Sequence, residues 1–293
     1  MRKVITITLL LLGIAVPSSG WGLVGHSIVN EAATFGAPSE MPFFFHRSYP
    51  QLIWLGYEPD RWRGAGDSID AFNAPNHFLD YEYVDHLDLP PRRYDFIELL
   101  YESGTLRDQG IDVDSAGFLP WRIAEVTQQL EREWRNWSRD DLTSAERIAV
   151  EDSIIFLSGV LGHYVADAAN PHHSTIHYNG WALTPVPDGF ATDCSTHFRF
   201  ETYYVSKTVD ERDVFALVGP AVLRDDYFET ALTLLRSSQE LVPEIYTIDA
   251  RGGFDPENES EEAYAFAVGR LATGAAFLRD LWWSAYLSGM GDR

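Results

Sequence analysis

Hydrophobic residues recur at intervals of three and four over residues 120–137, and the same period continues through residues 143–170. In the first segment the apolar positions are Ile123, Val126, Leu130 and Trp134, with Glu and Arg residues between them. This spacing places the apolar side chains on one face of an α-helix, which has to be buried against other elements. Two long adjacent helices, with little strand-like alternation elsewhere, predict an all-α fold with several helices.

The limits of the second helix are marked in the sequence. Thr143 and Glu146 have the spacing of a capping box, which predicts a helix start. Asn170-Pro171 predicts its end, because proline cannot continue a helix. Further helices are expected near Gly25 and over about 195–206, 221–248 and 258–288. Stretches rich in proline and glycine separate no independent apolar sets, so we expect one domain over residues 21–293; these stretches are 36–42, 56–66, 86–92 and 180–190.

Residues 1–20 have the pattern of a signal peptide. Arg2 and Lys3 precede an apolar run over 4–16, and Pro17-Ser18-Ser19-Gly20 supplies the small residues of a cleavage site. The run is too short to span a bilayer, and the apolar stretch near the C-terminus is interrupted by charged residues. We therefore expect a secreted or periplasmic protein without a transmembrane anchor.

Composition narrows the function classes. The chain has 22 Lys and Arg against 44 Asp and Glu, a net charge of −22, which argues against broad electrostatic binding to nucleic-acid backbones or anionic membranes. An anionic substrate held by metal ions remains compatible with this charge. Cys194 is the only cysteine, so an internal disulfide is excluded, and a packed, inert thiol is expected there.

The distribution of histidines indicates a metal site. His163 and Asp167 are four residues apart on the long helix and project from one face, and His197 and Glu201 repeat this spacing further on. His173 lies between the two pairs, just beyond the helix end. Imidazole nitrogens and carboxylate oxygens are ligands that zinc prefers. His172 competes with His173, whose spacing from Asp167 is favoured; structural or exposed roles are expected for His46, His86 and His177.

Signal cleavage would add further donors at the new N-terminus. It would make Trp21 the first residue, and an α-amine has a pKa near 8, low enough to lose its proton to a metal. The amine and the carbonyl oxygen of Trp21 would chelate one ion, with His26 as a third donor.

In this order and spacing, the motifs resemble the superfamily of bacterial zinc-dependent phospholipases C and of fungal and plant single-strand-specific nucleases. The resemblance covers the whole chain after residue 20. Its motifs are Trp21, Gly25-His26, His77-Phe78-Leu79-Asp80, the segment 163–173 and the segment 197–201.

The resemblance implies a mostly helical fold with three zinc ions in one cleft. The first ion would take Asp60, His77, His163 and Asp167. The second would take Trp21, His26 and Asp167, which makes Asp167 a bridging ligand. The third would take His173, His197 and Glu201, leaving positions open for water and substrate.

The resemblance also implies zinc-dependent hydrolysis of a phosphodiester. Asp60 would orient or deprotonate the attacking water, and Arg63, three residues later, would donate to the phosphate in the transition state. Asp67 and Asp70 are rivals for the role of Asp60. A bland surface cation is an equal alternative for Arg63.

The substrate stays open between a phospholipid and a single-stranded nucleic acid. Glu201 resembles the phospholipase branch and Arg63 the nuclease branch, whereas Val24 and Arg61 stand where the phospholipases have a Glu and a Tyr that bind choline. Aromatic residues serve a lipid-facing rim or a base-stacking clamp equally well. A zinc-binding protein without turnover is a third possibility, and no stable protein partner is evident. The candidate substrate-binding residues are Phe78, Asp80, Tyr178 and Trp181.

Overall fold

A computed structural model describes residues 21–291, so the expected signal peptide lies outside the described residues. Most of the described chain is helical. Its β features are two isolated bridges, Leu79 with Gly117 and Tyr178 with Gly180. The predicted all-α fold is confirmed. In chain order the α-helices are α1 (Gly22–Phe35), α2 (Phe43–Arg47), α3 (Tyr49–Leu55), α4 (Glu58–Arg61), α5 (Asp67–Asn73), α6 (Arg93–Ser103), α7 (Leu119–Trp137), α8 (Ser144–Ala169), α9 (Thr196–Phe198), α10 (Val205–Thr208), α11 (Glu211–Leu217), α12 (Tyr227–Gln239), α13 (Val242–Ala250) and α14 (Glu261–Met290).

Within the described residues, five short 3₁₀ helices and one π-helix lie between these α-helices. They are the 3₁₀ helices η1 (Ala74–His77), η2 (Tyr81–Tyr83), η3 (Arg107–Gln109), η4 (Val113–Ala116) and η5 (Pro171–Ser174), and the π-helix η6 (Arg199–Tyr204).

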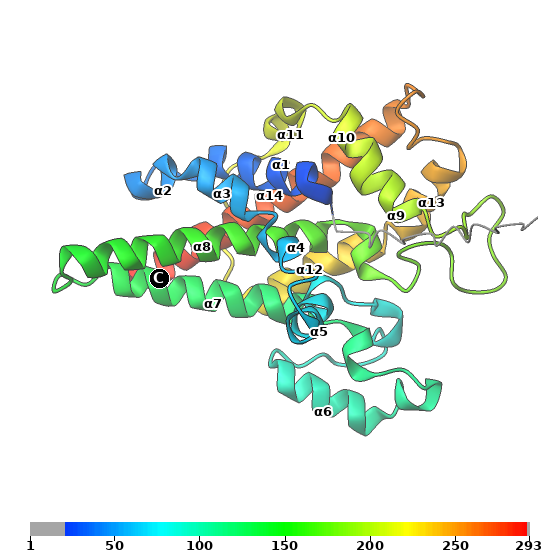
Figure 1. Cartoon of the computed structure of the whole chain (residues 1–293), viewed down its shortest axis with the longest axis horizontal. Coiled ribbons are helices and arrows are strands. Elements are labelled where there is room, and N and C mark those ends of the chain that lie inside the picture. Colours follow the sequence, from blue (N-terminus) through cyan, green and yellow to red (C-terminus); the bar gives the residue numbers. More distant parts are fainter. Residues whose placement is uncertain (1–20, 292–293) are drawn as a thin grey trace, which may run out of the picture.

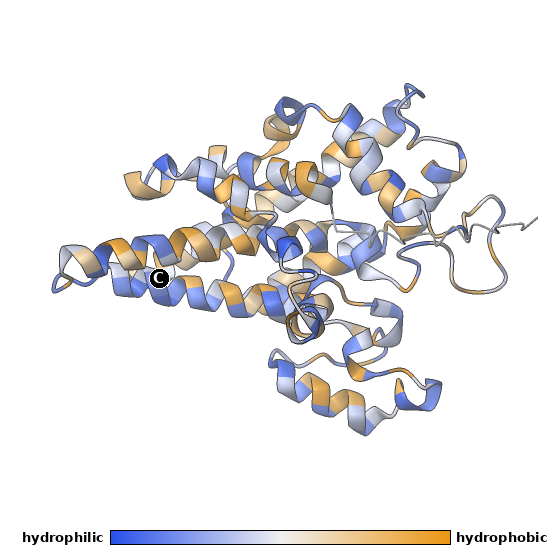
Figure 2. Ribbon diagram, viewed as in Figure 1, coloured by the Kyte–Doolittle hydropathy of each residue, from blue (hydrophilic) through white to orange (hydrophobic). Residues whose placement is uncertain are grey.

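α7 and α8 form a long antiparallel hairpin against which other helices pack (Figure 1). The predicted capping box is present at its second helix: the Thr143 hydroxyl accepts from the Glu146 amide, and the Glu146 carboxylate accepts from the Thr143 amide. α7 buries the predicted apolar stripe, including Ile123 and Trp134, and hydrophobic and hydrophilic residues alternate along this helix in Figure 2.

α14 runs through the core against α1, α7 and α8. Three charged residues in its interior are buried and partnered: Arg270 donates to the Ala169 carbonyl, and Arg279 donates to Asp280. Among described helices, α8 alone is long and apolar enough to cross a membrane by length and composition, and its C-terminal half is buried inside the fold.

The expected continuous helix over 221–248 is wrong. The chain is extended up to Asp226, whose side chain caps α12, and a second break precedes Pro243 in the first turn of α13. The extended part is held by α14, because Asp280 accepts from the Val222 amide and from the Arg224 guanidinium. These long-range bonds replace the local helical ones that the apolar pattern suggested.

Candidate metal centre

Close packing of α1, α3 and α8 brings the first ligands together. Gly162 on α8 leaves room for Asn30, since a Cβ at this glycine would lie 1.8 Å from the Asn30 Oδ1 atom. The Asn30 amide donates to the carbonyls of Leu52 on α3 (2.6 Å) and Gly159 on α8 (3.0 Å). As a result, the His26 ring of α1 stacks on the His163 ring of α8, with centroids 3.9 Å apart.

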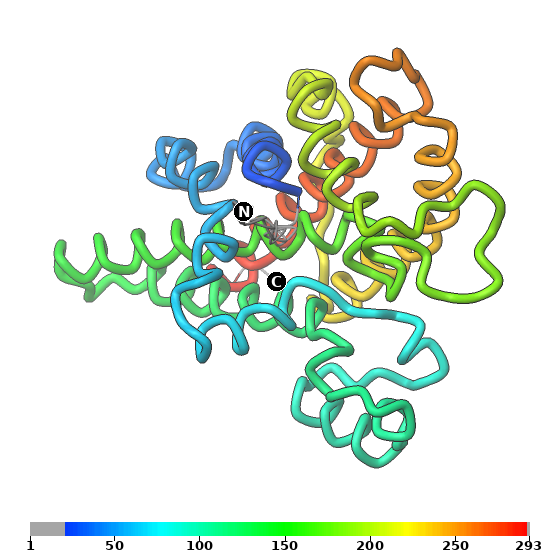
Figure 3. Tube along the Cα trace, turned by 45° about the vertical axis from the view of Figure 1, so that its right-hand side comes forward, coloured from blue at the N-terminus to red at the C-terminus, as the bar shows by residue number. Residues whose placement is uncertain are grey.

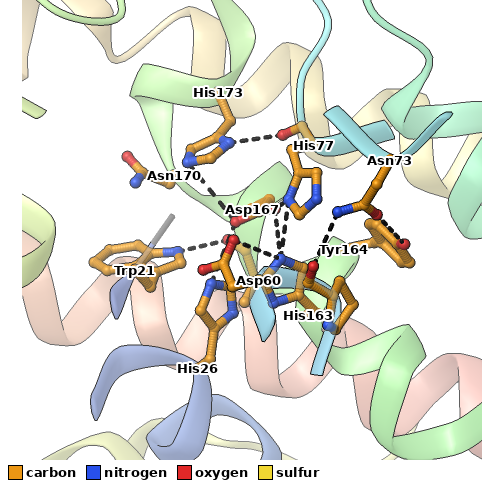
Figure 4. A network of polar contacts seen from close by, with 12 residues as sticks. Trp21, His26, Asp60, Asn73, His77, His163, Tyr164, Asp167, Asn170 and His173 are labelled. Carbon is orange, nitrogen blue, oxygen red and sulfur yellow. Dashed lines mark hydrogen bonds and ion pairs between the residues drawn. The ribbon is translucent and has the colours of Figure 1, made fainter. Parts of the chain in front are cut away.

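Four side chains from three segments converge in the first cluster (Figure 4). His77 Nδ1 lies 3.0 Å from both His163 Nε2 and Asp167 Oδ2. His163 Nε2 lies 3.3 Å from Asp167 Oδ2 and 3.9 Å from Asp60 Oδ1. Ligand atoms of a tetrahedral zinc ion are separated by roughly 3.3 Å when each bond is about 2.0–2.1 Å long. Asp60, His77 and His163 therefore lie close enough to share one ion, and Asp167 lies within reach of both imidazoles.

The third predicted ligand set also converges. His197 Nε2 lies 2.7 Å from Glu201 Oε2 and 3.2 Å from His173 Nε2, and His173 Nε2 lies 3.6 Å from Glu201 Oε2. Asn170 at the end of α8 donates to Glu201 Oε2 (3.1 Å). Three protein donors leave further coordination positions, as in catalytic zinc sites.

The second set is centred on His26 and Asp167, with His26 Nε2 3.5 Å from Asp167 Oδ1. Trp21 is buried beside them, and its indole donates to the Ala166 carbonyl (2.6 Å). The metal-binding role of the Trp21 amine depends on processing of residues 1–20, which lie outside the described residues. His163 groups with His26 as closely as with His77, whereas the resemblance gives it to one ion only.

Asp167 is the common member of the centre. Its Oδ2 faces His77 and His163, while its Oδ1 faces His26 (3.5 Å) and His173 (3.7 Å). A single buried carboxylate thus contacts imidazoles from all three sets, which is the position that a bridging ligand requires.

Backbone carbonyls fix the orientation of two imidazoles. His163 Nδ1 donates to the Gly56 carbonyl (2.9 Å), and His173 Nδ1 donates to the His77 carbonyl (2.6 Å). Because a carbonyl only accepts, the hydrogen of each neutral ring is on Nδ1 and the Nε2 lone pair points into the centre. Burial lowers the pKa of His163 to about 3 and that of His197 to about 3, so these rings are neutral.

The carboxylates of the centre are electrostatically unfavourable on their own. Burial raises the pKa of Asp60, Asp167 and Glu201, and the neighbouring carboxylates Asp60 and Glu201 raise that of Asp167 further. Within residues 21–291, Glu201 Oε1 and both ring nitrogens of His26 have no hydrogen-bond partner. Buried carboxylates and bare imidazole lone pairs are stabilised by a divalent cation, so the donor set, its spacing and its charge fit metal ions.

Protons and zinc compete for the carboxyl group of Glu201, which predicts a pH-dependent zinc affinity. Burial raises the pKa of Glu201 to about 7, and a metal ion needs this carboxyl ionised. Because zinc has to displace that proton, we expect zinc affinity at this set to fall roughly tenfold per unit as the pH falls below about 7, and to level off above it. Competition titrations with a chromophoric chelator at about pH 5.5, 6.5, 7.5 and 8.5 measure this; constant affinity across the series would contradict it.

A pocket of about 460 Å³ opens onto the first and third ligand sets. Arg63 lies at its edge, with Nε 2.9 Å from Asp60 Oδ1 and about a third of the side chain exposed (30%). Three of the four candidate substrate-binding residues are on its wall. The residues that line the pocket are Arg63, Ala74, His77, Phe78, Asp80, Ser115, His172, His173, Tyr178 and His197.

Trp181, the fourth candidate, is not part of this wall. Its ring stacks on His177 with centroids 3.8 Å apart and packs against Phe190 and Tyr246. Because Tyr246 is on α13, these contacts pack the loop after Tyr178, which Figure 3 draws in light green, against that helix, and Trp181 does not line the pocket.

Several other predictions about single residues can be compared with the structure. Asp67 is exposed, and Asp70 accepts from the Gly64 amide (2.8 Å), so neither rival joins the ligand sets that Asp60 joins. Cys194 is exposed, so the predicted packed thiol is wrong; the residue has a left-handed backbone conformation (φ 58°) just ahead of α9. His172, the rival of His173 as a ligand, is not in the ligand sets that converge and is buried on the pocket wall beside His197.

Glu201 lies on a π-helix where the sequence predicts an ordinary helix. In η6 the Val205 amide bonds to the Phe200 carbonyl five residues earlier. Arg199 on the same turn is held by two 2.7 Å bonds to Asp249 of α13. π-Helical turns are rare and frequently occur at functional sites.

No protein-family model and no curated protein matches this chain. Among solved structures, an alpha toxin from Clostridium absonum has a TM-score of 0.45 and 12% sequence identity, and covers 94% of this chain. The alpha-toxin of an avian strain of Clostridium perfringens has a TM-score of 0.43 and 14% identity, also over 94% of this chain. The chain spans less than two thirds of the length of each toxin, 66% and 65% respectively.

Proposed function

We propose that this protein is a zinc-dependent phosphodiester hydrolase of the superfamily that its motifs resemble. The observation that carries the proposal is the convergence of three buried ligand sets on Asp167 next to a pocket edged by Arg63. Zinc ions held there would supply Lewis-acid chemistry, which polarises phosphoryl oxygens and acidifies water. The sets that would hold them are Asp60, His77, His163 and Asp167; Trp21, His26 and Asp167; and His173, His197 and Glu201.

Asp60 and Arg63 carry the remaining chemistry in this proposal. Asp60 Oδ2 has no hydrogen-bond partner among the described residues, so it can accept a hydrogen bond from the attacking water. Arg63 lies beside Asp60 at the pocket edge, where its guanidinium would donate hydrogen bonds to a bound phosphate.

For the substrate, we infer a phospholipid from which a phosphorylated headgroup is released. Exposed apolar side chains beside the pocket support a lipid-facing rim. Tyr178 (49% exposed) is on the pocket wall, and two further exposed apolar residues lie on segments that adjoin pocket residues in sequence: Leu183 (53%) on the loop after Tyr178, and Phe198 (51%) directly after His197.

A single-stranded nucleic acid is the second candidate, and a different observation favours it. Phe78 and Asp80 line the pocket together, and burial raises the pKa of Asp80 to about 8, so its carboxyl is largely protonated at neutral pH. An aromatic face beside a group that both donates and accepts hydrogen bonds suits a nucleobase.

Hydrolysis assays on dispersed phosphatidylcholine and on single-stranded DNA, run side by side with zinc-loaded and chelator-treated protein, test the proposal. Chelator-sensitive release from lipid alone supports the phospholipase assignment, and cleavage of DNA alone supports the nuclease assignment. Zinc binding without turnover of either substrate would instead favour a zinc-binding protein with no catalytic role.

Arg63→Ala separates catalysis from metal binding. We expect kcat to fall roughly 100- to 1,000-fold, the usual cost of removing one donor to a transition-state oxyanion, while zinc content is retained. Arg92→Ala is a matched control, because Arg92 makes the same kind of i,i+3 ion pair, with Asp95, is exposed and does not line the pocket. Equal kcat values for the two variants would remove Arg63 from the mechanism.

Export to the periplasm or beyond is part of the same proposal and rests on the signal-like residues 1–20. N-terminal sequencing of the exported protein is expected to begin at Trp21. A mature chain that keeps further residues before Trp21 would lack the amine donor, and the second zinc set would then bind more weakly.

A further inference from the structure

The chain between Asp60 and His77 leaves the first cluster, passes over the surface and comes back to the same cluster. It leaves α4 through Gly64 and Gly66, both at positive φ (75° and 143°), and comes back through α5 and η1. Both ends supply groups to the first cluster. Something therefore has to hold the Asp60 turn in register with the His77 turn.

α4 does not achieve this alone. It has four residues, far fewer than an isolated helix needs to be stable in water. The side chains of Arg61 and Trp62 bond back to Trp54 and Glu58, which secures α4 to the end of α3 but does not reach η1.

Asn73 makes the missing connection. Its Nδ2 donates to the Pro59 carbonyl, the residue just before Asp60, at 2.9 Å. Its Oδ1 accepts from the Tyr164 hydroxyl at 3.4 Å, and Tyr164 follows His163 on α8. The side chain is buried (1% exposed), and Asn73 directly precedes η1, which ends at His77 (Figure 4).

One amide thus contacts the neighbours of two ligands, Asp60 and His163, from a position just ahead of the turn that carries a third, His77. We propose that Asn73 is a positioning residue for the first metal set: it holds the Asp60 turn against the segments that carry His77 and His163. This role rests on the proposed metal centre. It acts through the placement of Asp60, whose Oδ1 lies 3.9 Å from His163 Nε2.

The test is a zinc titration of the mature protein, beginning at Trp21, with a competing chelator that resolves three binding steps. In Asn73→Ala, and in Asn73→Asp, which keeps the shape and the acceptor but loses the donor to Pro59, one step is expected to weaken about 10- to 100-fold, the range seen when a group behind a metal ligand is removed. The other two steps keep their wild-type affinities. Tyr164→Phe, which removes only the long contact, is expected to change affinity far less than either.

Thr127→Val is the matched control. Thr127 is buried on α7 and bonds to the Ile123 carbonyl, so this variant loses a buried side-chain hydrogen bond away from α4. It is expected to lower the unfolding temperature and leave all three zinc steps unchanged.

The proposed role would be overturned if a folded Asn73 variant bound all three zinc ions with wild-type affinity. It would also be overturned if all three steps weakened equally, because that pattern marks a general loss of stability. If Asn73→Ala does not fold, the zinc affinities of the isosteric Asn73→Asp variant provide the test. Zinc binding is measured without substrate, so a wild-type protein that binds three ions and hydrolyses no phosphodiester contradicts the proposed function alone. A wild-type protein that binds no zinc contradicts both.

Discussion

Asp167→Asn is expected to remove two of the three zinc equivalents and to lower kcat/KM by roughly 1,000-fold or more, since metal ions supply several kcal/mol of transition-state stabilisation and each 1.36 kcal/mol is a factor of ten. The reason is geometric. Asp167 contacts the imidazoles of His77 and His163 through one oxygen and those of His26 and His173 through the other. An asparagine has the same shape but lacks the charge that two shared cations need.

Zinc content by mass spectrometry after gel filtration, together with steady-state kinetics, measures this effect. Asp152→Asn is the matched control, because it makes the same substitution on an exposed position of the same helix. The metal-free Asp167→Asn protein is expected to be at least as stable as metal-free wild type, because burial and two neighbouring carboxylates oppose ionisation of Asp167. Three retained equivalents in the variant would show that Asp167 does not bridge.

Removal of zinc is expected to lower the unfolding temperature by on the order of 15 °C. The figure follows from three sites, about 2.7 kcal/mol for each ion at a free concentration of 100 times its Kd, and about 2 °C per kcal/mol for a domain of this size. The loss has a direct cause, since without cations the centre is a buried collection of carboxylates and bare imidazole nitrogens.

Differential scanning calorimetry of the zinc-loaded and chelator-treated protein measures this change. Re-addition of zinc should restore the transition, whereas magnesium should not, because magnesium prefers all-oxygen ligands. Equal unfolding temperatures with and without chelator would mean that the ligand sets do not bind ions tightly.

The sequence predicts the parts of this molecule that depend on local pattern. The stripe of Ile123 and Trp134, the capping box at Thr143 and the stop at Asn170-Pro171 each have a short-range physical cause, and α7 and α8 lie where these signals put them. The extended chain before α12 follows no such signal, because Asp280, far away in sequence, supplies its hydrogen bonds.

In the candidate metal centre too, some ligands follow from local sequence patterns and others do not. Helical spacing alone places His163 beside Asp167 and His197 beside Glu201. That His26 and His77 join them is a long-range fact, suggested only by the order of motifs in the resembling superfamily. The packing of Trp181 against His177 and the exposure of Cys194 depend on how one loop folds onto α13, and no local pattern carries that information.

The π-turn that carries Glu201 makes this part of the chain intolerant of changes in length. A π-helix holds one residue more per hydrogen-bonded ring than an α-helix, here between Phe200 and Val205. Deleting one residue between them would let the turn relax to an α-helix and rotate all that follows by roughly 100° relative to His197 and Glu201. Point substitutions at exposed positions such as Tyr203 leave that register intact, so sequence variants of this turn should conserve its number of residues more strictly than their identity.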